Sequence, residues 1–464
     1  MSDGKTLWHG RFASGPAEEL MAYTASLPFD RRLWREDIAC SKSHVRGLAR
    51  VGIISNAECD TILSALEQVE SEMAADAFVF VDSDEDIHTA VERRVTEIAG
   101  PAGAKLHTGR SRNDQSVTGL RLWCKRVVPE VVARVISLQE VLLARAKEAG
   151  VGDDAVYLPG YTHVQRAQPV LLAHHLLAHC WAFGRDIERL RDASRRLDVS
   201  PLGAGALAGS SLPLDPEFTA ADLGFQRVFD NSLDVVSDRD FVAEILFALS
   251  LVAVHLSRMG EEWVLWTSDE FGFAVLDDAY ATGSSMLPQK KNADIAELAR
   301  GKAGRVVGSL TGLLVVLKGL PLSYNRDLQE DKEPLFDAVD QVSLALSALT
   351  GMIATARFAP DRMRAAADAP TMAATDLAEF LVQKGTPFRE AHAIVGSLVR
   401  RSLAGEGSLA ELVRAEPALG EEATALVAPG VGVRRRTTRG GAGPQPVAEQ
   451  MARLEAAMKV WAQK

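Results

Sequence analysis

The sequence predicts an all-α protein built around a bundle of long helices, and three observations support this prediction. Apolar residues at heptad spacing run through the middle of the chain, most clearly between Asp240 and Trp266. Aromatic residues make up only 6% of the sequence, while alanine, leucine and valine dominate, which favours helices packed through small and aliphatic side chains. Many positions beside the heptad ladders are also apolar, so these helices must be covered on several sides.

Each predicted long helix rests on its own stretch of sequence. Four predicted helices carry apolar ladders in which the steps alternate between four and three residues, which indicates near-parallel packing against neighbouring helices. A fifth helix is expected to begin at Gln168-Pro169, because proline suits a first helical turn, and to run to about Leu197. The residues of the four ladders are Val131, Val135, Leu138 and Leu142; Ile245, Leu249, Val252, Leu256, Met259 and Trp263; Val306, Leu310, Leu313 and Leu317; and Leu335, Val339, Val342, Leu346, Leu349 and Ile353.

The two flanks of the chain carry shorter helical patterns. Residues 1–110 are broken by Gly, Pro and Asp clusters, and short helices return after about residue 360, with a loop rich in Gly, Arg and Pro at 429–444. We therefore predict an N-terminal helical domain at 1–112, a central long-helix bundle at 113–360 and a small C-terminal helical domain at 361–464.

About five long helices with apolar character most of the way round cannot cover one another within one chain. We expect other subunits to complete the bundle. The alternative is a large monomeric helical domain.

The bulk properties exclude several classes of protein. A net charge of −11 argues against a nucleic-acid-binding surface, and it requires any site for an anionic substrate to gather its positive charge locally. The four cysteines form no Cys-x-x-Cys pair, which predicts buried free thiols in a reducing cytoplasm. The N-terminus lacks a signal-peptide pattern, and no stretch of about 20 apolar residues is free of charge. We expect a soluble cytoplasmic protein with no nucleic-acid or membrane partner.

Residues 283–292, Gly-Ser-Ser-Met-Leu-Pro-Gln-Lys-Lys-Asn, form a polar run between apolar helical stretches. Gly283 and Pro288 indicate a loop. Two hydroxyls, two ammonium groups and an amide suit a site that holds a carboxylate and moves a proton beside it. The alternative is a glycine–serine turn with solvated lysines.

Four other polar runs interrupt the helical pattern, at 84–88, 107–115, 159–165 and 324–332. Capping of helix ends explains one or two polar residues at each, but not Arg-Ser-Arg-Asn-Asp-Gln followed at once by Ser-Val-Thr. Neither a Gly-x-Ser-x-Gly nucleophile motif nor a Gly-rich phosphate loop is present. His174, His175 and His179 lie in an apolar stretch without a nearby acid, so we interpret them as packed or solvent-edge histidines rather than metal ligands. The chemistry that remains for these polar segments is proton transfer on a polycarboxylate substrate, without a metal or cofactor.

Gly-Ser-Ser-x-x-Pro-x-Lys-x-Asn at 283–292 resembles the signature of the fumarase/aspartase superfamily of lyases. The other polar blocks are similar to its argininosuccinate lyase branch, occur in family order and cover nearly the whole chain. Ser-Arg-Asn-Asp-Gln and Tyr-Asn-Arg-Asp-Leu-Gln-Glu-Asp-Lys separate that branch from fumarases, aspartases and adenylosuccinate lyases. The matching blocks are 7–12 (Leu-Trp-His-Gly-Arg-Phe), 84–88, 107–115, 159–169, 201–209 and 324–333.

The resemblance implies an all-helical three-domain subunit whose long helices join those of three others in a homotetramer with a core of about 20 helices. Each site would draw on three subunits. The implied reaction is the reversible cleavage of argininosuccinate to arginine and fumarate through a carbanion, in arginine biosynthesis, without a cofactor or metal.

The resemblance also implies roles for individual residues. Ser284 matches the loop serine, which we interpret as the base, with Lys290 beside it. His163 resembles the acid and Glu297 its charged partner, although the order of acid and base stays open. The alternative for His163 is a capping or packed histidine, and for Gln329 and Lys332 a solvated helix face. The implied substrate contacts are Ser26, Asn113, Thr162, Asn292, Tyr324, Gln329 and Lys332, with Arg112 as a further carboxylate clamp.

The chain departs from the family pattern at several places. Met286-Leu287 stands where Ile-Met is usual, and Ala293 replaces a proline, which restores a backbone N–H. Further departures occur at Ala204, Gly119 and Ala442-Gly443. A lyase that acts on another N-substituted succinate is therefore an alternative function. An inactive structural protein of this fold is the alternative from another class, and the retention of the four implied catalytic residues argues against it.

Overall fold

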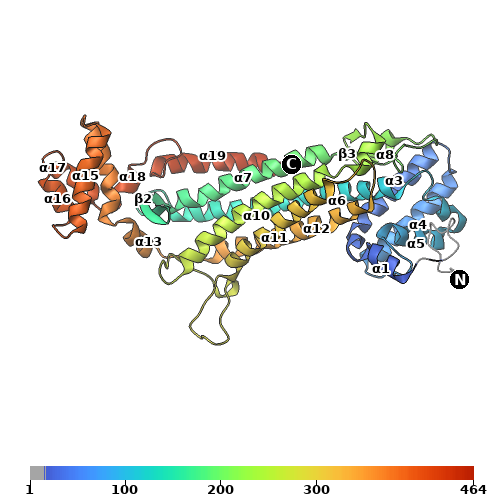
Figure 1. The fold of residues 1–464 in the computed structure, drawn as a ribbon, viewed down its shortest axis with the longest axis horizontal. Coiled ribbons are helices and arrows are strands. Elements are labelled where there is room, and N and C mark those ends of the chain that lie inside the picture. Colours follow the sequence, from blue (N-terminus) through green and yellow to red (C-terminus); the bar gives the residue numbers. More distant parts are fainter. Residues whose placement is uncertain (1–14, 16, 464) are drawn as a thin grey trace. The chain divides into compact units, whose positions relative to one another are not determined.

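The computed structural model describes residues 15 and 17–463, so the block at 7–12 lies outside the described residues. The prediction of an all-α fold is confirmed. Five helices in this part of the chain have 24 residues or more, and Figure 1 shows each of them as a long continuous rod. They are α6 (Arg112–Ala149), α7 (Leu172–Leu197), α10 (Asp240–Thr267), α11 (Asp294–Leu317) and α12 (Lys332–Thr355).

Shorter helices and a few strands make up the rest. The helices before α6 are α1 (Glu18–Thr24), α2 (Leu27–Asp30), α3 (Trp34–Arg50), α4 (Asn56–Ala74) and α5 (Ile87–Ala99). Those after α7 are α8 (Pro216–Asp222), α9 (Ser232–Ser237), α13 (Pro360–Ala367), α14 (Ala374–Gln383), α15 (Phe388–Leu403), α16 (Leu409–Ala415), α17 (Gly420–Thr424), α18 (Val431–Arg434) and α19 (Pro444–Ala462). The strands pair as β1 (Tyr157–Thr162) with β2 (Gln165–Leu171), β3 (Val199–Ser200) with β4 (Arg227–Val228), and β5 (Ala274–Val275) with β6 (Arg357–Phe358).

The predicted heptad ladders form the buried seams of the long helices. Every ladder residue of α6, α10 and α12 is buried, while Leu310 and Leu317 of α11 are only half-buried. Small residues let two of the helices come close, because a Cβ on Gly260 of α10 would lie 2.5 Å from the carbonyl oxygen of Ala296 on α11. The packing therefore follows the small and aliphatic pattern that the sequence predicts.

The predicted start of the helix at Gln168-Pro169 is wrong, although its end at Leu197 is confirmed. Pro169 lies in β2, directly opposite Pro159 of β1, and α7 begins only at Leu172. Proline cannot donate to a strand ladder, so it suits an edge strand as well as a first helical turn. The pairing with residues 157–162 decides between the two, and a local pattern does not reveal that pairing.

The chain divides into two compact units. The first comprises the described part of Met1–Val131 with Arg189–Ser250 and Arg305–Gln341, and the second comprises Val132–Glu188, Leu251–Gly304 and Val342–Lys464 up to residue 463. Within the second unit, α14 to α17 build an apolar cluster of their own around Leu381 and Val395. The three domains at 1–112, 113–360 and 361–464 stay a prediction.

The four cysteines, Cys40, Cys59, Cys124 and Cys180, are buried and free, as predicted. Two helical stretches, Asp240–Thr267 and Arg326–Thr355, are long and apolar enough to cross a membrane by length and composition alone. Buried helices of a globular bundle pass the same test, and 56% of the most apolar window of the first stretch is buried inside the protein. The buried seam of α10 accounts for the apolar character of the first stretch, whereas 39% of the corresponding window of the second stretch is buried.

The buried histidine of α3 makes the first unit sensitive to acid. Burial and the charge of Arg110 lower the pKa of His44 to about 3, and its Nε2 lies 2.9 Å from the carbonyl oxygen of Thr108. Because an unfolded histidine titrates near 6.5, the unfolded state binds more protons between these two values. We expect the free energy of unfolding to fall by roughly 2 kcal/mol from this group between pH 6.5 and pH 4.5.

Chemical denaturation at several pH values tests this expectation. In His44→Gln the loss of stability between pH 6.5 and pH 4.5 should be smaller than in the wild type by that amount. The matched control is His392→Gln, which changes an exposed histidine of α15 and should leave the pH profile as it is. Equal slopes in wild type and His44→Gln would contradict the assignment.

Candidate active site

The first unit contains a polar cleft of about 660 Å³ beside the start of α6. Nδ1 of His107 lies 3.5 Å from Oε2 of Glu92, and neither buried atom has a hydrogen-bond partner among the described residues. Such atoms are costly unless a ligand or water satisfies them, which indicates a site for a polar ligand. The cleft is lined by Leu20, Thr24, Glu85, Asp86, Glu92, His107, Arg112 and Arg326.

Arg112 lines this cleft, but its guanidinium is already held on several sides. Its Nε lies 3.0 Å from Oδ2 of Asp86, Nη1 donates to Gln115 at 2.6 Å and Nη2 donates to Thr89 at 3.0 Å. Burial by itself would raise the pKa of Asp86, but the charges of Arg112 and His88 and the hydrogen bonds of Thr89 together hold that pKa below its ordinary value. The structure therefore fixes Arg112 as a positioned cation at the edge of the cleft.

Ser26 is buried at the start of α2 and is tied to the segment that enters α5. Its hydroxyl donates to Oδ2 of Asp30 at 2.6 Å, and its backbone N–H donates to the carbonyl of Glu85 at 2.8 Å. The other oxygen of Asp30 accepts the backbone N–H of Ile87 at 3.0 Å. One buried carboxylate thus joins the predicted contact Ser26 to the block at 84–88.

A second buried carboxylate joins three helices. Nδ1 of His88 lies 2.7 Å from Oδ1 of Asp37 on α3, and Nε2 of Gln115 on α6 donates to the same oxygen at 2.6 Å. Burial by itself would raise the pKa of Asp37, but the charge and hydrogen bonds of His88, together with Arg110 and Gln115, lower it to about 2. The blocks at 84–88 and 107–115 are therefore locked together through a residue that carries no motif.

Asn113 and Asp114 connect the start of α6 with the block at 201–209. Nδ2 of Asn113 donates to the carbonyl of Ala206 at 2.9 Å, and Oδ2 of Asp114 accepts the backbone N–H groups of Gly203 and Gly205. Gly205 has φ +63°, and a Cβ there would lie 2.8 Å from the carbonyl oxygen of Gly209, so only glycine fits. Burial raises the pKa of Asp114 to about 6, although three backbone hydrogen bonds act in the opposite direction.

The block at 324–332 contributes three predicted contact residues to the same unit. Tyr324 is half-buried, which raises the pKa of its phenol, and Nε2 of Gln329 donates to the carbonyl of Thr24 at 3.3 Å. Lys332 is buried rather than solvated, and its ammonium donates to Oδ1 of Asp331 at 2.8 Å. The other oxygen of Asp331 is paired with the buried Arg239.

In the second unit, the loop 283–292 closes on a narrow neck. The backbones of Thr282 and Asn292 exchange two hydrogen bonds, and the hydroxyl of Thr282 donates to Asp294 at the start of α11 at 2.6 Å. Figure 1 shows the loop projecting from the ends of the helices that flank it. Inside the loop, Oγ of Ser284 accepts the backbone N–H groups of Met286 and Leu287 at 3.2 and 3.0 Å.

The two loop lysines differ in their contacts. Nζ of Lys291 donates to the carbonyl of Leu276 and to Oδ1 of Asp278, both at 2.6 Å. Lys290 is exposed, and its ammonium forms no ion pair with a described residue. Lys291 therefore anchors the loop, and Lys290 is available to a ligand. Glu297, in the first turns of α11, is also exposed.

Thr162 and His163 lie at the tip of the β1–β2 hairpin and not at a helix end. Thr162 pairs with Gln165, so His163 and Val164 form a two-residue loop with φ +53° and +59°. Positive φ at both positions is the pattern of a type I′ turn, which normally takes Asn-Gly. A β-branched valine in that conformation is an outlier, and such strain is typical of functional sites.

The structure thus brings the predicted site residues together in two groups. Ser26, Arg112, Asn113, Tyr324, Gln329 and Lys332 belong to the first unit, and Thr162, His163, Ser284, Lys290, Asn292 and Glu297 belong to the second. No hydrogen bond or ion pair joins His163 to Glu297 within the described residues of one chain, and both side chains are exposed. Asp37 on α3 and Glu92 on α5 were not predicted, because both lie outside the motif blocks. A charged residue inside an apolar helical face was the available signal.

The interpretation that no acid lies near His175 and His179 is wrong. Nε2 of His175 and Nε2 of His179 lie 2.8 and 2.7 Å from Oε2 of Glu262, which comes from α10. The acid is 83 residues away from His179 in sequence, so only the packing of α7 on α10 reveals it.

Comparison with known proteins agrees with these motifs. A lyase family model matches residues 10–308, and a model of the argininosuccinate lyase C-terminal domain matches residues 371–429. The chain is 51% identical to the argininosuccinate lyase of Symbiobacterium thermophilum over 96% of this chain and 97% of that protein, and 52% identical to that of Acidothermus cellulolyticus over 97% and 94%. The chain belongs to the argininosuccinate lyase family.

Membership in the argininosuccinate lyase family, within the fumarase/aspartase superfamily, makes the chain a carbon–nitrogen lyase. A solved structure of EDDS lyase in complex with formate is similar over 97% of this chain and 91% of that chain, with a TM-score of 0.83 and 28% sequence identity. The family thereby confirms the resemblance that the loop at 283–292 indicated.

The strained hairpin tip gives a stability prediction. A non-glycine residue at positive φ costs about 1–2 kcal/mol, while glycine costs some entropy in the unfolded chain, so Val164→Gly should leave the stability unchanged or raise it by up to about 1 kcal/mol. The matched control is Val170→Gly in β2 of the same hairpin, a half-buried position with ordinary strand geometry, which should lose about 1–3 kcal/mol. Thermal unfolding at one protein concentration measures both. Equal losses in the two variants would contradict strain at Val164.

Proposed function

We propose that the chain catalyses the reversible β-elimination of argininosuccinate to L-arginine and fumarate, in arginine biosynthesis in the cytoplasm. The observation that carries this proposal is the loop at 283–292, where two backbone N–H groups point at Oγ of Ser284 and the ammonium of Lys290 is unpaired among the described residues. Family membership supplies the substrate class.

The first chemical step removes a proton from a carbon next to a carboxylate. This carbon is a very weak acid, and the carbanion places its charge on the carboxylate as an aci-carboxylate. Fixed positive donors at that carboxylate stabilise the transition state more than the ground state. Lys290 and Asn292 are suited to this role, because both lie on the loop that carries Ser284.

Ser284 acts as the base in this proposal. The two backbone N–H groups that its Oγ accepts lower the energy of the alkoxide form, and the nearby ammonium of Lys290 acts in the same direction. The proton from carbon goes to this oxygen, and the electron pair of the C–H bond passes into the carbanion.

In the second step the electron pair of the carbanion forms the C=C bond of fumarate, and the C–N bonding pair leaves with the nitrogen. This nitrogen takes a proton from His163 to release arginine. Glu297 of another subunit supports the imidazolium form of His163 by its charge. Both residues are exposed in one chain, as a pair completed between chains requires. Ser26, Arg112, Asn113, Thr162, Tyr324, Gln329 and Lys332 hold the rest of the substrate.

The proposed active form is a homotetramer in which three subunits contribute to each site. Large apolar side chains that are exposed in one chain support it, because soluble proteins rarely expose such rows. They occur on three of the long helices: Phe247 and Val254 on α10, Leu298, Val307, Leu314 and Val315 on α11, and Leu344 on α12. We infer that these faces pack against the same helices of other copies.

A lyase for another N-substituted succinate is the second candidate. Met286, Leu287 and Ala293 depart from the family pattern in the loop that we propose to contact the substrate. In addition, the similar solved structure is named as an EDDS lyase and not as an argininosuccinate lyase. Fumarate release monitored by its absorbance separates the candidates when argininosuccinate, adenylosuccinate, aspartate and malate are offered in turn. We expect useful turnover with argininosuccinate alone.

A pair of lysine variants tests the role of the loop. Lys290→Met removes a cation aimed at the developing charge, so kcat should fall by a factor of about 100 or more, while Lys291→Met removes an anchor and should cost less than tenfold. Both variants lose one ammonium from neighbouring positions, so overall charge does not distinguish them. A larger loss of kcat in Lys291→Met than in Lys290→Met would overturn the assignment.

A further inference from the structure

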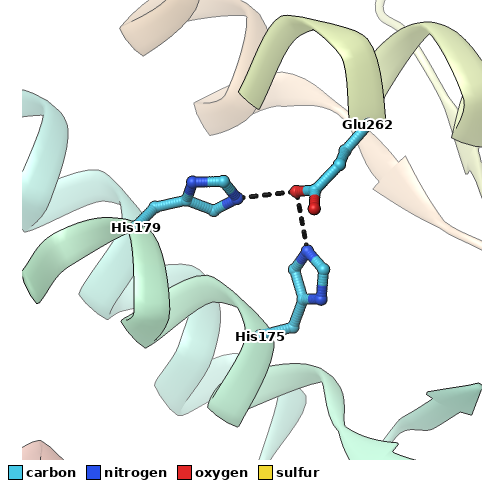
Figure 2. Close-up of side chains that lie close together, drawn as sticks. All are labelled: His175, His179 and Glu262. Atoms are coloured by element: carbon cyan, nitrogen blue, oxygen red, sulfur yellow. Dashed lines mark hydrogen bonds and ion pairs between the residues drawn. The ribbon is translucent and has the colours of Figure 1, made fainter. Parts of the chain in front are cut away.

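Three side chains that the proposed reaction does not use meet between α7 and α10. Figure 2 shows His175 and His179, one helical turn apart on α7, with both rings directed at Glu262 on α10. Nε2 of His175 lies 2.8 Å from Oε2 of Glu262, and Nε2 of His179 lies 2.7 Å from the same oxygen. All three residues belong to the second unit.

The arrangement places three ligand atoms around one point. Two histidines at i and i+4 face the same side of a helix, as they do where a helix supplies two imidazoles to zinc. The nitrogen and oxygen atoms of the cluster all lie within 4.8 Å of one another. Zinc bonds of about 2.0–2.2 Å place tetrahedral ligand atoms roughly 3.3 Å apart, so each nitrogen needs to move only about half an ångström away from Oε2 of Glu262. The two nitrogens already lie within 4.8 Å of each other.

The surroundings keep the rings in place and leave a path for an ion. The ring of His175 packs on Trp266 with centroids 4.9 Å apart, and Trp266 is itself buried against Trp263. The side chains of His175, His179 and Glu262 are 23%, 16% and 36% exposed. Because the three side chains are packed on one side and exposed to solvent on the other, water can occupy the fourth ligand position of a tetrahedral metal ion.

The competing interpretation is a hydrogen-bonded cross-link between two helices, with no metal. That interpretation requires both imidazoles to place a proton on Nε2 and to share one oxygen of a single carboxylate. A metal uses the same three atoms as ligands without those protons. Among the described residues, this is the one group of three His, Cys, Asp or Glu side chains whose ligand atoms converge in this way.

We propose that His175, His179 and Glu262 form a binding site for a divalent transition-metal ion of the zinc type, which fastens α7 to α10. Two imidazoles and one carboxylate suit Zn²⁺, Co²⁺ or Ni²⁺, whereas Mg²⁺ and Ca²⁺ take oxygen ligands. The proposal is independent of the lyase reaction, because none of the three residues belongs to the proposed catalytic or substrate-binding groups.

Equilibrium dialysis of the full chain against Zn²⁺, after treatment with a chelator, tests the site. We expect one ion per chain in the wild type and at least tenfold weaker binding in His179→Gln and in Glu262→Gln. Co²⁺ provides a second readout, because a site with four ligands gives visible absorption bands that should disappear in both variants. All four cysteines are buried, so they offer no exposed thiol that competes for the ion.

The matched control is His174→Gln, which changes the neighbouring half-buried histidine on α7 outside the cluster. It should bind Zn²⁺ as the wild type does. Since an ion that binds the folded chain stabilises it, Zn²⁺ should raise the Tm of the wild type and of His174→Gln but not of His179→Gln or Glu262→Gln. Circular dichroism confirms that each variant is folded. Absence of stoichiometric binding in the wild type, or equal binding in His179→Gln and His174→Gln, would overturn the proposal.

Discussion

Buried aspartates hold the segments of the first unit that carry the site residues. Asp30, Asp37, Asp86, Asp114 and Asp331 are each no more than 9% exposed, and each pairs with a segment that is distant in sequence or carries a motif. A buried carboxylate that loses its partner costs about 3–5 kcal/mol, so these contacts fix where the motif segments lie. The polar core of the unit is therefore what gives the cleft its shape.

This constraint also separates groups that a partner within the chain fixes from groups that are exposed. Carboxylates hold the cations Arg112 and Lys332 in the positions from which we propose that they contact the substrate. In the second unit the opposite holds for His163, Lys290 and Glu297, which are exposed. We propose that the rigid cleft of one chain receives the loop and the hairpin tip of other chains, so that association brings the unsatisfied groups together and excludes water from them.

Much of the fold could be predicted from the sequence because it depends on local periodicity. Heptad ladders such as Ile245 to Trp263 are buried along their whole length, and the motif segments at 107–115, 283–292 and 324–332 lead into the long helices α6, α11 and α12. The hairpin could not be predicted, since the role of Pro169 depends on its pairing with Pro159. The contacts of Asp37 and Glu262 could not be predicted for the same reason, because the sequence around a charged residue on a helix does not indicate which distant residue it contacts.

The central claim is that each active site draws on more than one chain, and mixing two inactive variants tests it most directly. His163→Asn removes the hairpin-tip group and Lys290→Met removes the loop cation, so neither variant alone should turn over argininosuccinate at a useful rate. If the two groups of one site come from different chains, refolding both variants together should restore up to about a quarter of the wild-type activity, because that share of sites then combines an intact tip with an intact loop. No recovery in mixed tetramers that are shown to form would contradict the account.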